Sequence, residues 1–176
     1  MIKLFTAALA ALSIATPSVA GVFEDHKVLW NTLQRVGVQT YINNPDMCDG
    51  DNDGSYYPSM GYLVICQDKA TSRQETTWTA NDLDTLRHEA FHVLQDCQDG
   101  FEDNNTLAPY TSSPSHLADM LAGSSYTLPQ IKAIAGSYEE QGASKHVVLL
   151  ELEAFAAADS LSATHIASLI KQQCTY

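Results

Sequence analysis

The chain has 176 residues, with 9 lysine and arginine side chains against 21 aspartate and glutamate side chains, a formal net charge of −12. Such an acidic surface repels phosphate groups and anionic lipid headgroups, so nucleic acid and membranes are excluded as expected partners. The length is sufficient for one domain with a hydrophobic core of its own.

Residues 1–20 have the pattern of a secretory signal peptide. Lys3 is followed by an apolar run over residues 4–14 and then by small residues that end at Ala20. The apolar run is too short to span a bilayer. We therefore expect a secreted or periplasmic monomer whose mature part is a single domain at residues 21–176.

The first half of the mature chain predicts one helix and two strands. Apolar residues at helical spacing predict a helix over residues 22–36, and an alternating pattern predicts a strand over residues 38–42. Residues 43–58 are rich in Asp, Asn, Gly and Pro and predict a loop, whereas the apolar run 61–66 predicts a second strand. The two strands are expected to form a short antiparallel sheet.

Part of the predicted loop resembles a calcium-binding sequence. Asp49, Asp51 and Asp53 belong to a D-x-D-x-D-G stretch, the opening half of an EF-hand loop. Position twelve of that loop is Met60 instead of a bidentate glutamate, and the flanking segments are predicted as strand or coil. An acidic surface turn is therefore the favoured interpretation, with Ca2+ as the alternative.

The strongest motif is H-E-x-x-H, formed by His88, Glu89 and His92. It lies within residues 81–97, where an apolar stripe at helical spacing predicts a helix. Residues four apart lie on one helix face about 5–6 Å from each other, so the two histidines can bind one metal ion. Glu89 lies at the edge of that face, where it can act on a water molecule, as in zinc hydrolases.

The second half of the mature chain is predicted to be helical after a polar loop. The predicted helices cover residues 114–121, 128–137, 143–158 and 161–173. The expected fold is thus a small α+β domain in which the short antiparallel sheet packs on a mainly helical body.

Four cysteines without a C-x-x-C pair favour two disulfides in an exported chain. The sequence leaves three pairings open. We favour Cys48 with Cys66, which closes a local loop, and Cys97 with Cys174, which joins the end of the motif helix to the C-terminal helix.

A catalytic zinc site normally uses three protein ligands, so one more is needed. The extended metzincin motif places a histidine six residues after His92, but that position is Gln98. The best source is the helix at residues 143–158, because Glu151 and Glu153 are costly to bury unless they are paired or bound to a metal. They lie about 200° apart on a helix, so only one can face the metal. The other candidate ligands are His116, His146 and His165.

With these two helices the chain resembles the gluzincin branch of the zincin metallopeptidases. In that family H-E-x-x-H is followed on a later helix by a glutamate with a small residue three positions on, often spelled E-x-E-A, and residues 151–154 spell E-L-E-A. The resemblance implies a zincin-like fold, with His88, His92 and Glu151 as Zn2+ ligands and Glu89 as general base.

Two positions near the motifs depart from the family pattern or leave alternatives open. Many gluzincins have an acidic residue four positions after the third ligand, where it supports a histidine, but this chain has Phe155 there. No partner of the ligand histidines is therefore assigned. Gln95, one turn past His92, is expected either to line the cleft or to be an exposed polar residue.

The resemblance implies an exported zinc metallopeptidase that hydrolyses peptide bonds through a zinc-activated water, with Glu89 as base. His146 is the first candidate to stabilise the oxyanion, ahead of Tyr138 and Tyr110. The family also implies that the strand at residues 61–65 binds the substrate backbone as an added strand.

The alternative function is a non-catalytic secreted domain in which zinc is structural and the protein binds a partner. A structural zinc site usually has four protein ligands, most of them cysteines, whereas this chain offers three ligands without a cysteine among them. A glutamate beside the ligands further favours catalysis.

Overall fold

The computed structural model describes residues 19–48, 52–102 and 104–174. Within these ranges the chain forms six α-helices and one three-stranded sheet, which confirms the expected α+β class. The expected signal peptide falls largely on residues 1–18, and the candidate calcium loop includes residues 49–51. These stretches lie outside the described residues, so the signal peptide and the calcium site stay predictions.

The predicted helices are all present, with ends shifted by a few residues. They are α1 Val19–Arg35, α2 Ala80–Gln98, α3 Pro114–Gly123, α4 Leu128–Glu140, α5 Lys145–Ser160 and α6 Ala163–Gln173. A capping box starts α2: the Asp82 backbone N–H donates to the Thr79 hydroxyl at 3.0 Å, and the Thr79 N–H donates to the Asp82 carboxylate at 2.6 Å. Serine caps at Ser113, Ser144 and Ser162 start α3, α5 and α6.

The sheet is mixed, which corrects the expected antiparallel arrangement. Its strands are β1 Gln39–Ile42, β2 Gly54–Tyr57 and β3 Tyr62–Ile65, in the order β1-β3-β2. The two strands that the sequence predicts, β1 and β3, pair in parallel, whereas β2 pairs antiparallel to β3. The short turn Pro58–Met60 allows only an antiparallel pair between β2 and β3, and the longer connection through β2 allows β1 to run parallel to β3.

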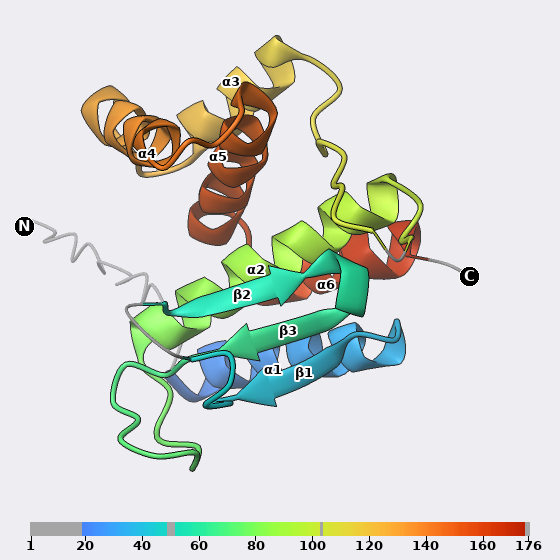
Figure 1. The fold of residues 1–176 in the computed structure, drawn as a ribbon, viewed down its shortest axis with the longest axis vertical. Helices are drawn as coiled ribbons and strands as arrows, with labels where there is room; N and C mark the ends of the chain where they lie inside the picture. Colours follow the sequence, from blue (N-terminus) through green and yellow to red (C-terminus); the bar gives the residue numbers. More distant parts are fainter. Residues whose placement is uncertain (1–18, 49–51, 103, 175–176) are drawn as a thin grey trace, which may run out of the picture.

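Helix α2 runs across the middle of the molecule. In Figure 1 the sheet and α1 lie on one side of it, and α3, α4 and α5 lie on the other. Helix α6 packs against both α1 and α2.

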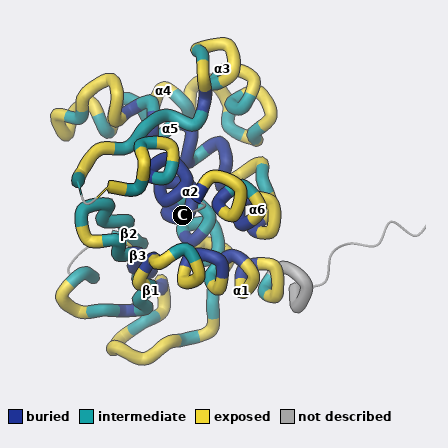
Figure 2. The backbone as a smooth tube through the Cα atoms, turned by 90° about the vertical axis from the view of Figure 1, so that its right-hand side faces the viewer, coloured by how far each residue is buried: buried dark blue, intermediate teal, exposed yellow. Residues whose placement is uncertain are grey.

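The buried core includes Leu29 and Leu33 of α1, Leu63 and Ile65 of β3, Phe91 and Leu94 of α2, Ala154 and Ala157 of α5, and Ile166 and Ile170 of α6. Figure 2 shows this burial along α2 and α5, whereas α3 and α4, whose residues are all described, have none that is buried.

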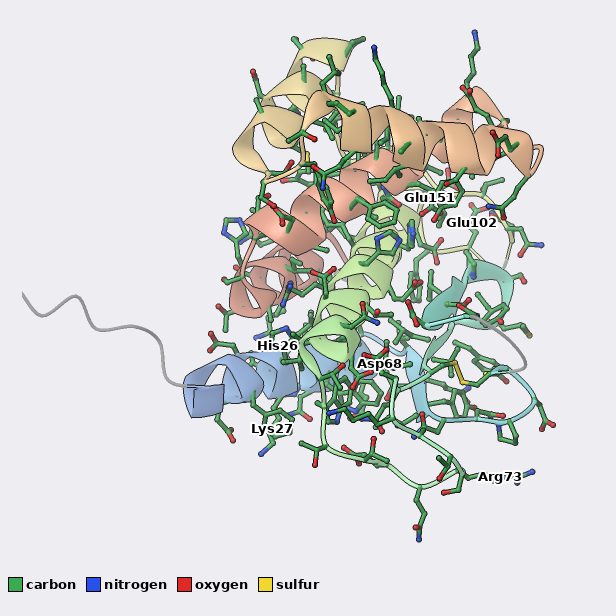
Figure 3. The ribbon with its side chains drawn as sticks, turned by 90° about the vertical axis from the view of Figure 1, so that its left-hand side faces the viewer. His26, Lys27, Asp68, Arg73, Glu102 and Glu151 are labelled. Atoms are coloured by element: carbon green, nitrogen blue, oxygen red, sulfur yellow. A yellow bond between two sulfur atoms is a disulfide. The ribbon has the colours of Figure 1, made fainter. Side chains whose placement is uncertain are left out.

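Arg87 links three helices beside the motif. Its guanidinium group lies 2.7 Å from the His26 ring of α1 and donates at 2.6 Å both to the Asp84 carboxylate and to the Ala158 carbonyl of α5. Figure 3 shows His26 where α1 meets α2. The bond to Ala158 satisfies a carbonyl in the last turn of α5 and so fixes that helix relative to α2.

Both favoured disulfides are present. Cys48 pairs with Cys66 and ties the segment after β1 to the end of β3, while Cys97 pairs with Cys174 and joins the ends of α2 and α6. Disulfides are typical of oxidising, extracellular compartments. Among the described residues, no helix has the length and apolar character needed to cross a membrane.

We expect the Cys97–Cys174 disulfide to stabilise the fold more than the Cys48–Cys66 disulfide. A cross-link restricts the unfolded chain more as the loop grows, and the two sequence separations are 77 and 18 residues. Replacing both cysteines of the long loop with serine should cost about 4–5 kcal/mol, against about 3 kcal/mol for the short loop. Guanidinium unfolding of the two double variants measures both losses, and a larger loss for the short loop would contradict the expectation.

Candidate metal centre

Helix α2 places the two motif histidines together on one face. His88 Nε2 and His92 Nε2 are 3.2 Å apart, and the ring centroids are 4.8 Å apart. His92 and Glu89 are both buried, while His88 is half-buried. The four-residue spacing on a capped helix accounts for this convergence.

Glu151 of α5 completes the group. Its Oε2 lies 3.2 Å from His88 Nε2, and its Oε1 lies 3.6 Å from His92 Nε2. Ligand atoms of the three residues all lie within 4.8 Å of one another, so this group could hold a metal ion. Figure 3 shows Glu151 on α5, above α2. We refer to His88, His92 and Glu151 together as the candidate metal centre.

The donor atoms of the candidate metal centre fit a cation. Glu151 Oε2 is buried and accepts no hydrogen bond of acceptable geometry, although His88 Nε2 is 3.2 Å away. A buried carboxylate oxygen without a donor is costly, and a metal ion would satisfy it. Two imidazole nitrogens and a carboxylate oxygen are ligands that divalent transition metals share.

Charges within the centre shift two pKa values in opposite directions. Burial has the largest single effect on His92 and lowers its pKa, but the neighbouring carboxylate of Glu151 and the charge of Glu89 outweigh it and raise the pKa to about 9. Burial also has the largest single effect on Glu151 and raises its pKa. Close contact with both histidine rings, together with their charges, holds the pKa of that carboxyl well below its usual range.

Packing against aromatic rings holds His88 in place. The Phe155 ring centroid lies 4.5 Å from that of His88, and the rings of Tyr126 and Tyr138 lie 6.2 and 6.4 Å from that of Phe155. Phe155 occupies the position where many gluzincins have an acidic residue. Apolar contact therefore supports His88 on this side in place of a carboxylate.

The structure separates the two glutamates of α5. Glu153 is fully buried, and its carboxylate accepts hydrogen bonds from Gln95 Nε2 at 2.9 Å, from the Tyr110 N–H at 2.8 Å, and from the N–H at 2.9 Å and the hydroxyl of Thr111. Four donors thus satisfy Glu153, and Glu151 is the glutamate that joins the histidines.

Gln95 is neither a cleft residue nor an exposed one. It is fully buried, with Oε1 2.7 Å from His92 Nδ1, while Nε2 donates to the Leu150 carbonyl at 3.0 Å and to Glu153. The sequence does not assign this partner of His92. The signal that points to it is the three-residue spacing after His92, which puts Gln95 on the same helix face.

His146 is not brought to the candidate metal centre. It is exposed, its Nε2 lies 2.9 Å from the Leu107 carbonyl, and it is not among the residues that line the cavity above the centre. Five helical residues separate it from Glu151, which places it about 140° around α5 from that ligand. The other candidate histidines, His116 and His165, are exposed on α3 and α6.

The two candidate tyrosines have different surroundings. Tyr138 of α4 lines the cavity above the centre, and burial and the nearby charge of Glu151 raise its pKa. The Tyr110 ring packs on Phe91, with centroids 5.5 Å apart, and its backbone N–H bonds Glu153. Of the two, Tyr138 is thus the tyrosine at the centre.

A cavity of about 600 Å³ opens above the candidate metal centre. Strand β2 forms one wall, Tyr138 and Gln141 lie on another, and Glu89 is in the lining. β2 is an edge strand, whereas β3 has a neighbour on each side. This corrects the expectation that residues 61–65 accept an added strand, because only an edge strand can do so.

Gly54 lets β2 lie directly against the motif face of α2. A Cβ atom at this position would lie 2.6 Å from Thr85 Cγ2, 2.9 Å from the Val64 carbonyl oxygen and 3.3 Å from Glu89 Cγ. Only glycine fits such a close approach without a shift of the strand. The edge strand and Glu89 therefore meet at the cavity.

Comparison with protein families, with curated proteins and with solved structures gives no match for this chain. Function must therefore be inferred from the site itself. Its features are the converging donor atoms, the buried Glu89 beside them and the cavity bounded by an edge strand.

We expect metal binding to release a proton from His92. The pKa of about 9 keeps His92 protonated at pH 7 in the metal-free protein, whereas a ligand imidazole must be neutral. Affinity for Zn2+ should therefore rise about tenfold per pH unit up to pH 9 and then level off. Calorimetry at pH 7 in two buffers of different ionisation enthalpy measures the released proton. An affinity that does not change between pH 7 and 9 would contradict the raised pKa.

Proposed function

We propose that the protein is an exported zinc metallopeptidase that hydrolyses peptide bonds. The observation that carries this proposal is the convergence of His88, His92 and Glu151 beside the buried carboxylate of Glu89, under a cavity with an edge strand in its wall. Zinc is the proposed ion because two histidines and one carboxylate form a three-ligand set that leaves a position for chemistry.

Glu89 is positioned to act as the general base. It follows His88 directly, lines the cavity and does not belong to the candidate metal centre. Its carboxylate can thus take a proton from the attacking water and deliver it to the leaving amine. A zinc ion bound at the centre would polarise the scissile carbonyl and increase the acidity of water.

Tyr138 is the proposed donor to the oxyanion, in place of His146. Its raised pKa keeps the phenol protonated, so that it donates a hydrogen bond at neutral pH. It faces the same cavity as Glu89, whereas His146 does not line that cavity. A fixed donor beside developing negative charge lowers the barrier of acyl transfer.

Strand β2 is the proposed binding site for the substrate backbone. It lies at the edge of the sheet and contributes all of its residues, Gly54–Tyr57, to the cavity wall. An extended peptide can pair with such an edge through main-chain hydrogen bonds.

We expect Glu89→Gln to keep the metal and the fold while peptide hydrolysis falls at least about a hundredfold, since the general base is lost. The substitution keeps the side-chain size, so a cavity cannot explain the fall. Cleavage of unfolded polypeptides and elemental analysis measure the two effects.

Glu24→Gln, at an exposed position on α1, is the control that should keep full activity. A Glu89→Gln variant as active as the wild type would contradict the assigned role. A zinc-loaded wild type that cleaves no peptide would instead favour the non-catalytic zinc-binding domain.

Changes at the candidate metal centre should act on the metal itself. His88→Ala and His92→Ala are expected to lower Zn2+ affinity by several orders of magnitude, and Glu151→Gln should weaken binding because a neutral amide is a poorer ligand than a carboxylate. Competition with a coloured chelator measures these affinities. His146→Ala is the matched control and should bind as the wild type does, whereas full zinc in His88→Ala would rule out the assignment.

A further inference from the structure

A buried chain of hydrogen bonds leads from the candidate metal centre into the protein. His92 Nδ1 is 2.7 Å from Gln95 Oε1, and Gln95 Nε2 is 2.9 Å from Glu153 Oε2. Gln95 and Glu153 are fully buried, and neither lines the cavity above the centre. They therefore lie behind His92, away from any bound substrate.

The partners of Glu153 fix the direction of this chain. Besides Gln95, every group that its carboxylate meets is a donor: the N–H groups of Tyr110 and Thr111 and the Thr111 hydroxyl. An ionised carboxylate only accepts hydrogen bonds, and burying its charge requires several such donors. Gln95 must therefore turn its NH2 group towards Glu153, where that group also serves the Leu150 carbonyl.

The orientation of Gln95 determines the state of His92. With the NH2 group committed to two acceptors, Gln95 presents its Oε1 to His92 Nδ1. An oxygen at this place requires a proton on Nδ1, so the lone pair of the neutral ring lies on Nε2. Nε2 is the atom that faces His88 and Glu151.

The same carboxylate also holds the loop before α3. Its bonds to Tyr110 and Thr111 anchor the end of that loop, and Asn105 and Leu107 of the loop line the cavity above the centre. The Glu153 carboxylate thus contacts both Gln95, which holds His92, and the end of the loop that forms part of the cavity wall.

We propose that Glu153 is a positioning residue, which through Gln95 sets the tautomer and orientation of His92 for metal binding and through Tyr110 and Thr111 holds the loop beside the cavity. The inference rests on the proposed metal site. In many metal sites a carboxylate bonds directly to the ligand histidine, whereas here a neutral amide stands between them.

Glu153→Gln tests the proposal. The new amide can offer its oxygen to only one of the two donor pairs. With the oxygen on Thr111, its NH2 group points at the Tyr110 N–H and at Gln95, which must then turn over and present its own NH2 group to His92 Nδ1. That arrangement favours the wrong tautomer, so Zn2+ affinity should fall about 10–100-fold. In the zinc-loaded protein, the hydrogen-bonded Nδ1–H proton resonance of His92 should shift or disappear.

The exchange variant Gln95→Glu with Glu153→Gln provides the rescue. The carboxylate at position 95 then accepts from His92 Nδ1, and the amide at position 153 donates to that carboxylate. Much of the zinc affinity should therefore return. A merely structural role predicts a double variant at least as impaired as the worse single one. Gln95→Met, which leaves three donors on Glu153, should also lose affinity and provides the same test should Glu153→Gln not fold.

Thr111→Val is the matched control. It removes one donor from Glu153 but leaves Gln95 in place, so the Tm should fall while zinc affinity and the His92 resonance stay unchanged. Glu153→Gln with a lowered Tm but wild-type zinc affinity would overturn the proposal. Because no readout uses hydrolysis, a failed peptidase assignment would leave these results untouched, whereas a wild type without zinc would overturn both.

Discussion

Helices α2 and α5 pack against each other, and this contact brings His88 and His92 to Glu151. Three polar contacts join the two helices. Arg87 donates to the last turn of α5, and the two histidines contact Glu151. Gln95 donates to the Leu150 carbonyl and to Glu153. These polar contacts therefore fix the register of α5 on α2, and the position of each metal-ligand atom depends on that register.

The two glutamates of α5 show two ways of compensating a carboxylate taken from water. Glu153 has four hydrogen-bond donors and needs nothing else. Glu151 has two imidazole rings and a buried oxygen without a hydrogen bond, an arrangement that a cation would complete. The same helix thus provides one carboxylate for support and one for binding, and the supporting one reaches the centre only through Gln95.

The sequence predicts the features that depend on local spacing. Residues four apart on a capped helix must share a face, so the pairing of His88 with His92 follows from α2 alone. The sequence does not predict whether Glu151 or Glu153 faces the histidines, because that depends on which side of α5 meets α2. Strand β2 has no alternating apolar pattern, and its pairing depends on contact with β3 and on the close fit of Gly54 against α2.

The central claim is that His88, His92 and Glu151 hold a zinc ion, and anomalous diffraction at the zinc absorption edge tests it most directly. Crystals grown from protein loaded with one equivalent of zinc should show a single strong anomalous peak per chain, bonded to both histidine Nε2 atoms and to a carboxylate oxygen of Glu151. A peak at the acidic loop of residues 49–53, or no peak between α2 and α5, would contradict the claim.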